Sequence, residues 1–367
     1  MQNRDRVMKR ICIVAGARPN FVKVAPLLRA FSNAKGAECQ LVYAGCEDDP
    51  TLEPSLFDDL QMPSPDAYLG VDSQSLNEIT AQVMGRLDDY LERHPTDFVI
   101  VVDDLASTMA AAITAKKRGI CVAHLVAGTR SFDISMPKEI NRLVIDALSD
   151  YLFTAGVKSN SVATREQQSE SAQTYMVGNI LMDTLRYNLH RFRKPSQFHL
   201  LPSSYIVLTL NRHVLLGDEL QLKLMLQTLI EKTGDVPIVS PLRGLALGIV
   251  VRLLTELNVS SSKFHVLESL PYLEFGWLTA NARGIVTDSG NVAEEATFNA
   301  VPCITLNDYV EHQETVTVGT NVLVGNDIPK FLDALNLMVS GQWKKAALPD
   351  RWDGRSAERI CQILLSQ

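Results

Sequence analysis

The alternation of short apolar runs with helical segments is the feature that constrains this chain most. Residues 10–15 form an apolar run of strand length, and residues 20–34 then place apolar side chains at helical spacing. Further buried strands are predicted at 39–43, 98–102, 120–125, 151–154 and 174–177, and helices at 74–93, 106–118, 138–149, 157–168 and 180–192. Strands that are apolar throughout, each followed by a helix, are typical of a parallel sheet with helices on both faces.

The alternation breaks once and then resumes. Segments 191–197 and 201–204 mix charge, proline and serine, and we predict that they link two domains. Strand-like runs continue at 205–210, 237–239, 263–267, 284–287, 303–306 and 321–324. A chain of 367 residues is also too long for one compact core. We therefore expect two Rossmann-like, doubly wound α/β domains, 8–190 and 200–350, with a cleft between the carboxyl ends of their strands and a C-terminal helix, 354–367, packed back on the first domain.

Composition argues against several classes of protein. Hydrophobic residues make up 46% of the chain and charged residues 21%, which is ordinary for a soluble globular protein. The net charge of −7 argues against a nucleic-acid partner, because phosphate contacts need a basic face. No apolar run approaches the roughly 18 residues of a membrane span, and the polar residues 1–9 are not followed by the apolar segment of a signal peptide. The six cysteines lack metal or disulfide spacing and indicate small core residues in a reducing cytoplasm.

One strand-to-helix junction, residues 285–296, has the features of an anion site. An apolar run ends, Ser289 and Gly290 turn the chain, and an acidic, alanine-containing helix is predicted to follow. Unpaired N–H groups and the helix dipole at such a start favour a phosphate or diphosphate. Glu294 and Glu295, one turn later, suit the hydroxyl groups of a ribose. The alternative is an ordinary junction in which the serine caps the helix.

Charged residues at other predicted strand ends each have two interpretations. Arg18 precedes a helix and is predicted to contact an anion, although it could also cap a strand end. Lys23, about a turn further on, is either a second ligand contact or a solvated charge. Asp104 follows an apolar strand, where a carboxylate is usually functional in open α/β sheets. Asp103 and Asp104 could instead cap the helix that is predicted to begin near residue 106.

Three other residues have mainly structural interpretations. Tyr272 and Phe275 are helix-spaced, which is more typical of core residues than of side chains that stack on a base. His124 stands at a predicted strand end and is interpreted as a structural histidine. No His/Cys cluster or paired acidic motif predicts a metal site, and no cofactor is expected.

Motifs that occur in one order along most of the chain carry a resemblance. Segment 16–27 opens the series. The others are Asp104 with 107–108, and 124–130, 137–142, 178–179, 271–275, 287–295 and 319–320. Together they resemble the non-hydrolysing UDP-N-acetylglucosamine 2-epimerases, and so many motifs in register make the match specific. The resemblance implies Rossmann-like domains in a GT-B arrangement, a UDP-sugar bound in the cleft, a homodimer and a role in cell-envelope or capsule polysaccharide synthesis.

The resemblance also implies a reaction and a set of substrate contacts. Family enzymes remove the C2 proton of the sugar, expel UDP to give a glycal, and add UDP back with C2 inverted. The C2–H bond is not activated by a neighbouring carbonyl, so the bases must be well placed, and the departing diphosphate needs positive groups or acids. The residues that match substrate contacts are Arg18, Lys23, Arg130, Arg142, Arg212, Tyr272, Phe275, Ser289, Gly290 and Glu295.

The chain departs from the family at positions that carry its acid–base groups. The family aspartate matches Asp104. The two family glutamates fall at Val126 and Lys138, and the family histidine falls at Asn211. An arginine among the UDP contacts falls at His312. Losing one such group typically costs orders of magnitude in rate, so ordinary 2-epimerase turnover is not expected.

Neighbouring residues offer two rescues. Glu139 lies beside Lys138 and could replace the missing carboxylate, and His213 lies two residues after Asn211 and could replace the histidine. Asp104, Glu139 and His213 are therefore the predicted catalytic residues. Three hypotheses remain open: a 2-epimerase with impaired or altered activity, a UDP-sugar-binding protein without that chemistry, and a GT-B glycosyltransferase.

Overall fold

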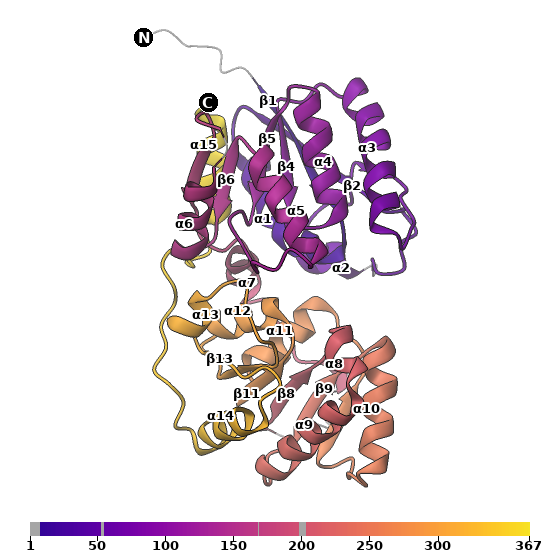
Figure 1. Ribbon diagram of the computed structural model, residues 1–367, viewed down its shortest axis with the longest axis vertical. Coiled ribbons are helices and arrows are strands. Elements are labelled where there is room, and N and C mark those ends of the chain that lie inside the picture. Colours follow the sequence, from indigo (N-terminus) through magenta and orange to yellow (C-terminus); the bar gives the residue numbers. More distant parts are fainter. Residues whose placement is uncertain (1–7, 53–54, 168, 198–202) are drawn as a thin grey trace. The chain divides into compact units, whose positions relative to one another are not determined.

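The computed structural model describes residues 8–52, 55–167, 169–197 and 203–367. The chain divides into two compact units, Met1–Tyr187 with Asp350–Gln367, and Asn188–Pro349. Each unit is a Rossmann-like α/β domain with one parallel sheet (Figure 1), so the predicted fold class is confirmed. Residues 1–7 of the polar start and residues 201–202 of the predicted linker lie outside the described residues.

The N-terminal domain is built on a seven-stranded sheet in the order β3-β2-β1-β4-β5-β6-β7. The chain leaves β1 in one direction and starts again at β4 on its other side, so the topological switch point lies between these two strands. The strands are Lys9–Ala15 (β1), Ala37–Tyr43 (β2), Ala67–Tyr68 (β3), Phe98–Val102 (β4), Cys121–Leu125 (β5), Tyr151–Thr154 (β6) and Gln173–Met176 (β7). The helices are Arg18–Asn33 (α1), Ser55–Leu60 (α2), Leu76–Arg93 (α3), Ala106–Lys117 (α4), Pro137–Leu148 (α5), Val157–Glu166 (α6), Leu181–Asn188 (α7) and Ser356–Leu365 (α15).

Helices cover this sheet because alternate strand residues point to opposite faces. Cys12 and Val14 of β1 join a core cluster with α3 and α4, while Ile11 and Ile13 between them are equally buried. Helices α3, α4 and α5 pack side by side on one face (Figure 1), and α1 packs on β1 and β2 together with α15. Local sequence sets some of the helix starts: the Ser75 side chain accepts the Glu78 N–H at the start of α3, and prolines occupy the first turns of α1 and α5.

The end of the chain returns to the N-terminal domain. Trp352 is completely buried, and its indole N–H donates to the Ala155 carbonyl at 3.0 Å. The Asp183 carboxylate accepts the N–H groups of Ser356 and Ala357 at 3.1 and 2.8 Å. This carboxylate therefore satisfies two of the N–H groups at the start of α15 that have no partner within the helix.

The C-terminal domain is built on a six-stranded sheet in the order β10-β9-β8-β11-β12-β13. Its switch point lies between β8 and β11 by the same argument. The strands are Ile206–Thr209 (β8), Ile238–Pro241 (β9), Phe264–Leu267 (β10), Gly284–Thr287 (β11), Cys303–Thr305 (β12) and Asn321–Leu323 (β13). The helices are His213–Gly217 (α8), Glu219–Lys232 (α9), Gly244–Glu256 (α10), Tyr272–Ala280 (α11), Gly290–Phe298 (α12), Glu314–Thr317 (α13) and Ile328–Ser340 (α14).

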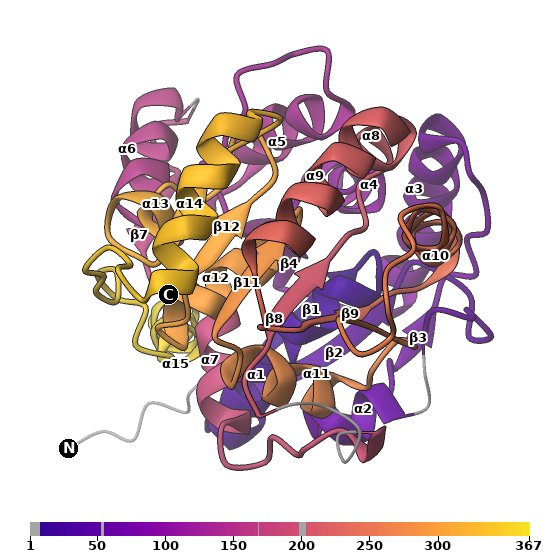
Figure 2. The same cartoon turned by 90° about the horizontal axis from the view of Figure 1, so that it is seen from below.

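Two apolar clusters lie on opposite faces of this second sheet. Ile206 and Leu208 belong to a cluster with residues of α9, α10 and α14, and Figure 2 shows α9 beside α14. Tyr205 and Val207 belong to the other cluster, with residues of α11 and α12. The alternation along β8 explains why its sequence is apolar throughout.

The predicted strands and helices of the N-terminal half are confirmed to within a few residues. Helix α2 and strand β3 were not predicted, because six and two residues carry no periodic pattern. None of the helices in the described ranges combines the length and the apolar character that a membrane span requires.

Candidate functional site

Three residues with left-handed backbone lie at or near the carboxyl edge of the N-terminal sheet. Asp103 after β4 has φ +60°, Val126 after β5 has φ +74°, and Phe132 in the loop before α5 has φ +60°. For the β-branched Val126 this conformation is sterically unfavourable. Backbone held in such regions is concentrated at functional sites, so this edge is the candidate site of the N-terminal domain.

Asp104 lies at the centre of this edge and is held by two cations. Arg142 contacts its Oδ2 through Nε at 2.8 Å and Nη2 at 2.6 Å, and Lys138 Nζ lies 3.2 Å from its Oδ1. Burial alone would raise the pKa of Asp104, but Lys138 and Arg142 outweigh it and lower that pKa. The capping alternative for Asp104 is wrong, because the N-cap residue of α4 is Leu105 and α4 has no side-chain cap.

Glu139 is buried and faces the loop before its own helix. Its Oε2 accepts the Ser131 N–H at 2.8 Å, the Ser131 hydroxyl at 2.9 Å and Arg142 Nη1 at 3.3 Å. Its Oε1 accepts the Phe132 N–H at 3.2 Å. These bonds outweigh the effect of burial and lower the pKa of Glu139. The catalytic role of Glu139 stays a prediction, and acting on a ligand would require breaking these bonds.

Lys23 and Arg18 lie at the start of α1, beside the switch point. Lys23 Nζ is 2.6 Å from Asp103 Oδ1 and its side chain is only 8% exposed, so the alternative that Lys23 is a solvated charge is wrong. Asn20 donates to the other oxygen of Asp103 at 2.8 Å. Arg18 is the first residue of α1 and is half-buried.

Arg130 and His124 belong to a buried network centred on Asp146. Asp146 Oδ1 lies 2.6 Å from His124 Nδ1, and its Oδ2 lies 2.7 Å from Arg130 Nη1. Arg130 Nε also contacts Glu166 at 2.9 Å. His124 is therefore structural, as predicted. Arg130 is engaged in the same network, and its role as a substrate contact stays a prediction.

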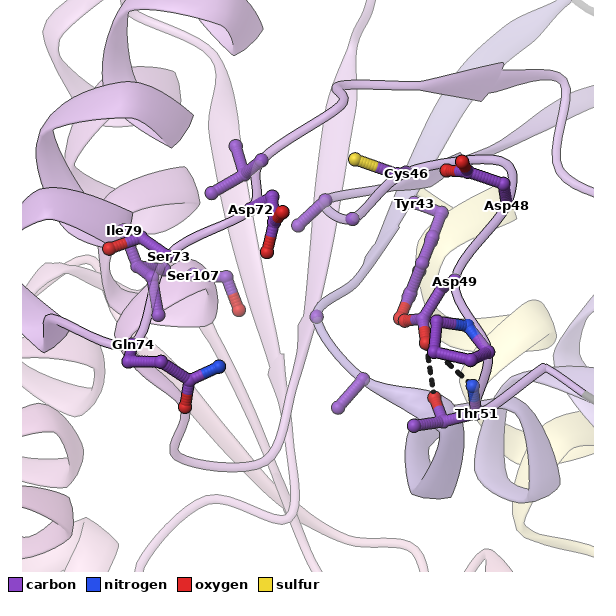
Figure 3. Close-up of a pocket in the computed structure, with 16 residues that line it drawn as sticks. Tyr43, Cys46, Asp48, Asp49, Thr51, Asp72, Ser73, Gln74, Ile79 and Ser107 are labelled. Carbon is purple, nitrogen blue, oxygen red and sulfur yellow. Dashed lines mark hydrogen bonds between the residues drawn. The ribbon is translucent and has the colours of Figure 1, made fainter.

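A cavity of about 540 Å³ opens beside the loops that follow β1, β2 and β3. Asp48, Asp49 and Asp72 line it, with Cys46 and Tyr43 (Figure 3). Asp49 accepts the Tyr43 hydroxyl at 2.5 Å and the Thr51 N–H and hydroxyl at 2.8 and 2.7 Å. None of the predicted site residues lines this cavity, and its three carboxylates do not suit a diphosphate.

In the C-terminal domain the predicted phosphate site is the start of α12. Ser289 is the residue before the helix, and its side chain makes no capping bond, so the capping alternative is wrong. A Cβ added to Gly290 would meet nothing within 4 Å. Both residues are half-buried. Open space at the first turn of a nine-residue helix fits an anion at its N-terminus.

Two buried carboxyl groups follow within the same helix. Burial and the neighbouring Glu294 raise the pKa of Glu295 to about 8. Glu294 Oε1 lies 3.8 Å from His312 Nε2, and both side chains are 4% exposed. Glu295 is therefore a neutral acid at pH 7, which can both donate to and accept from a hydroxyl group.

Arg212 and His213 follow β8, the strand beside β11. The Arg212 guanidinium lies 5.7 Å from the centre of the Tyr309 ring, and His213 is exposed at the start of α8. Tyr272 and Phe275 lie on α11 and are half-buried. Phe275 packs against the domain core, while the Tyr272 ring meets Phe192 edge-on at 6.5 Å.

The structure thus brings the predicted residues together in separate groups within each domain. Arg18, Lys23, Asp104, Glu139 and Arg142 lie at the carboxyl edge of the first sheet, and Arg212, His213, Ser289 and Gly290 lie at that of the second. The sequence interpretation missed the partners of these groups: Asp103, Ser131, Asp146 and Asp288. In the part of the chain that the structure describes, no group of three or more His, Cys, Asp and Glu side chains could hold a metal ion.

Comparison with known proteins adds an independent finding. Residues 29–365 match the family described as UDP-N-acetylglucosamine 2-epimerase. The UDP-N-acetylglucosamine 2-epimerase of Methanocaldococcus jannaschii is 32% identical over 370 residues, which cover 97% of this chain and 98% of the relative. The UDP-2,3-diacetamido-2,3-dideoxy-D-glucuronate 2-epimerase of Pseudomonas aeruginosa is 31% identical over 322 residues, covering 86% of this chain and 88% of the relative.

A solved structure resembles the fold over its full length. The crystal structure of Methanocaldococcus jannaschii UDP-GlcNAc 2-epimerase in complex with UDP-GlcNAc and UDP superimposes with a TM-score of 0.86 at 31% identity, covering 98% of this chain and 100% of that chain.

Proposed function

Because the chain belongs to the UDP-N-acetylglucosamine 2-epimerase family, we propose that it binds a UDP-sugar and that its 2-epimerase reaction is impaired. The start of α12 carries the first part of this proposal. Open space at Gly290 lets a phosphate approach the main chain. Arg212 is a candidate second contact, since guanidinium groups pair well with phosphate oxygens.

The ion pair between Lys138 and Asp104 carries the second part. A base that removes the C2 proton must present an oxygen or nitrogen with a free lone pair to that proton. Asp104 is contacted on both oxygens by cations, and Glu139 is contacted on both oxygens by donors. A carboxylate whose pKa is lowered in this way is also a weaker base. Position 126 is a valine, which cannot accept a proton. The carboxyl edge of the N-terminal sheet therefore has few groups that could act as the base.

Two measurements test the parts separately. Calorimetric titration with UDP and UDP-N-acetylglucosamine tests binding, and we expect a dissociation constant in the micromolar range, which is typical of substrate sites. Incorporation of solvent deuterium at C2, followed by NMR at high enzyme concentration, tests the chemistry, and we expect slow exchange at most. The absence of UDP binding would refute the first part, and rapid exchange would refute the second.

Assembly and location complete the proposal. We propose a cytoplasmic homodimer, which the family resemblance favours, and the six free cysteines are consistent with a reducing compartment. Light scattering after size-exclusion chromatography would show a mass near 40 kDa instead of about twice that value if the chain were a monomer.

A further inference from the structure

Asp288 connects the ends of neighbouring strands in the C-terminal sheet. It follows β11 directly and is 1% exposed. Its Oδ2 accepts the N–H groups of Asn211 and Arg212, both at 2.8 Å. These two residues follow β8, which pairs with β11 at Thr209 and Thr287. The carboxylate therefore reaches across the switch point and fixes the backbone that carries Arg212.

The main chain of Asp288 makes a matching connection on its other side. Its carbonyl accepts the Asn307 side-chain amide at 2.9 Å. Asn307 follows β12, two residues before Tyr309, whose ring lies under the Arg212 guanidinium at 5.7 Å. Asp288 thus holds the backbone of Arg212 through its side chain. Through its carbonyl it holds the loop that carries the aromatic partner of the same arginine.

The second oxygen of the carboxylate indicates that stability alone does not explain Asp288. Oδ1 is buried and receives no hydrogen bond from any described residue. A buried carboxylate with an unsatisfied oxygen is unfavourable for folding. A carboxylate also accepts N–H bonds more strongly than a neutral oxygen does. Asp288 thus fixes the backbone of the loop that carries Arg212 although its unsatisfied oxygen lowers the stability of the fold. A loss of stability that holds a loop in place is typical of binding sites.

We propose that Asp288 is a positioning residue of the UDP-sugar site. It holds Arg212 so that the guanidinium and the Ser289–Gly290 turn meet the same diphosphate. Fixing the backbone of Arg212 and the loop of Tyr309 before the ligand arrives lowers the conformational entropy that binding must cost. This inference rests on the proposed function, because it needs a ligand phosphate at the start of α12.

A double-mutant cycle tests whether Asp288 acts through Arg212. UDP affinity is measured for the wild type, Asp288→Ala, Arg212→Ala and the double variant. We expect each single change to weaken binding about tenfold, because each removes the oriented charge–phosphate contact, and the double variant to be no weaker than the poorer single one. Asp288→Asn should restore affinity to within about threefold, since its amide oxygen can accept the same two N–H groups.

The controls separate positioning from folding. Asp327→Ala removes another carboxylate-to-amide bond in the same domain, at the start of α14, and should lower the melting temperature without changing UDP affinity. The inference would be overturned if the losses of UDP affinity in the two single variants multiply in the double variant, or if Asp288→Ala binds UDP as well as the wild type does. Either result would leave the proposal of UDP binding standing. A wild type that does not bind UDP would overturn the proposed function and this inference with it. If Asp288→Ala does not fold, Asp288→Asn decides together with hydrogen exchange at the Asn211 and Arg212 amides. Unchanged exchange with UDP affinity within about threefold of the wild type supports the inference, and unchanged exchange with a loss of about tenfold or more contradicts it.

Discussion

Lys138 Nζ lies 3.2 Å from Asp104 Oδ1, on a carboxylate whose other oxygen is already held by Arg142. The lysine side chain is 53% exposed, whereas that of Asp104 is 10% exposed. Lys138, in the first turn of α5, thus forms an ion pair with Asp104. Asp104 is the residue that matches the catalytic aspartate of the family. The pair is partly screened by solvent, so its main effect is on the basicity of Asp104 and less on stability.

Restoring carboxylates at the two substituted positions should raise activity. The double variant Val126→Glu/Lys138→Glu removes the lysine that pairs with Asp104 and introduces two carboxylates that can transfer protons. We expect deuterium incorporation at C2 to increase at least about tenfold, since each such group typically contributes more than that. Ile140→Glu is the matched control, because it adds a carboxylate on the same helix at a side chain that is 45% exposed. Equal exchange in all three proteins would show that other residues limit the reaction.

Glu139 should matter for stability whatever its role in chemistry. Glu139→Gln loses charge-assisted bonds to Ser131, Phe132 and Arg142, and we expect the N-terminal domain to lose about 2 kcal/mol at pH 7. The pKa of Glu139 is lowered in the fold, so its contribution is present above the unfolded pKa and fades as pH falls below it. Thermal melting at pH 7 and pH 4 measures both effects. The exposed Glu92→Gln is the control, and an equal loss there would contradict the argument.

Asp183 should make stability depend on pH in the opposite sense. Burial raises its pKa to about 6, so the folded chain binds the proton more tightly than the unfolded chain. Its contribution is therefore fully present below about pH 4 and is lost as pH rises to about 6. Asp183→Asn keeps one of the two N–H bonds to α15, because Ser356 and Ala357 donate to different oxygens of Asp183 and the variant has a single amide oxygen. Melting curves from pH 4 to 8 should show a smaller decline for this variant than for the wild type, whereas the exposed Asp89→Asn should leave the decline unchanged.

The sequence predicts backbone structure better than it predicts side-chain partners. The strands were found because short apolar runs are local signals, and the start of α12 was found because a serine–glycine turn after such a run is also local. Lys23 with Asp103, and Asp288 with Arg212, are separated by 80 and 76 positions. Only the order of the strands brings these pairs together. The sequence pattern at Lys23 is the same for a buried ion pair as for a solvated charge.

Gly290 offers a test that separates ligand binding from folding. Because a Cβ there comes within 4 Å of no described residue other than its chain neighbours and the backbone of its own helix turn, Gly290→Ala should fold normally. The same methyl group would occupy the space that a phosphate needs, so we expect UDP affinity to fall about tenfold or more. Gly248→Ala is the matched control, since Gly248 lies inside α10 and its Cβ would also meet nothing within 4 Å. Equal UDP affinity in the two variants would show that the phosphate does not bind at the start of α12.

Glu295 provides the last and most discriminating variant, because stability and binding should change in opposite directions. Its pKa of about 8 means that the fold keeps the carboxyl group protonated while the unfolded chain ionises it. The stability of the C-terminal domain should therefore fall as pH rises from about 4.5 to about 8. Glu295→Gln removes this penalty, and we expect the free energy of unfolding to rise by up to about 4 kcal/mol at pH 8.

The same substitution replaces a carboxyl group that can serve the ribose hydroxyls, so UDP affinity should fall several-fold while the melting temperature rises. Calorimetry and thermal melting on the same preparations measure both quantities, with the exposed Glu231→Gln as the control. If the variant gains stability and keeps its UDP affinity, Glu295 is not part of the binding site. A variant that loses both would show that Glu295 supports the fold and that its burial is compensated by bonds within the domain.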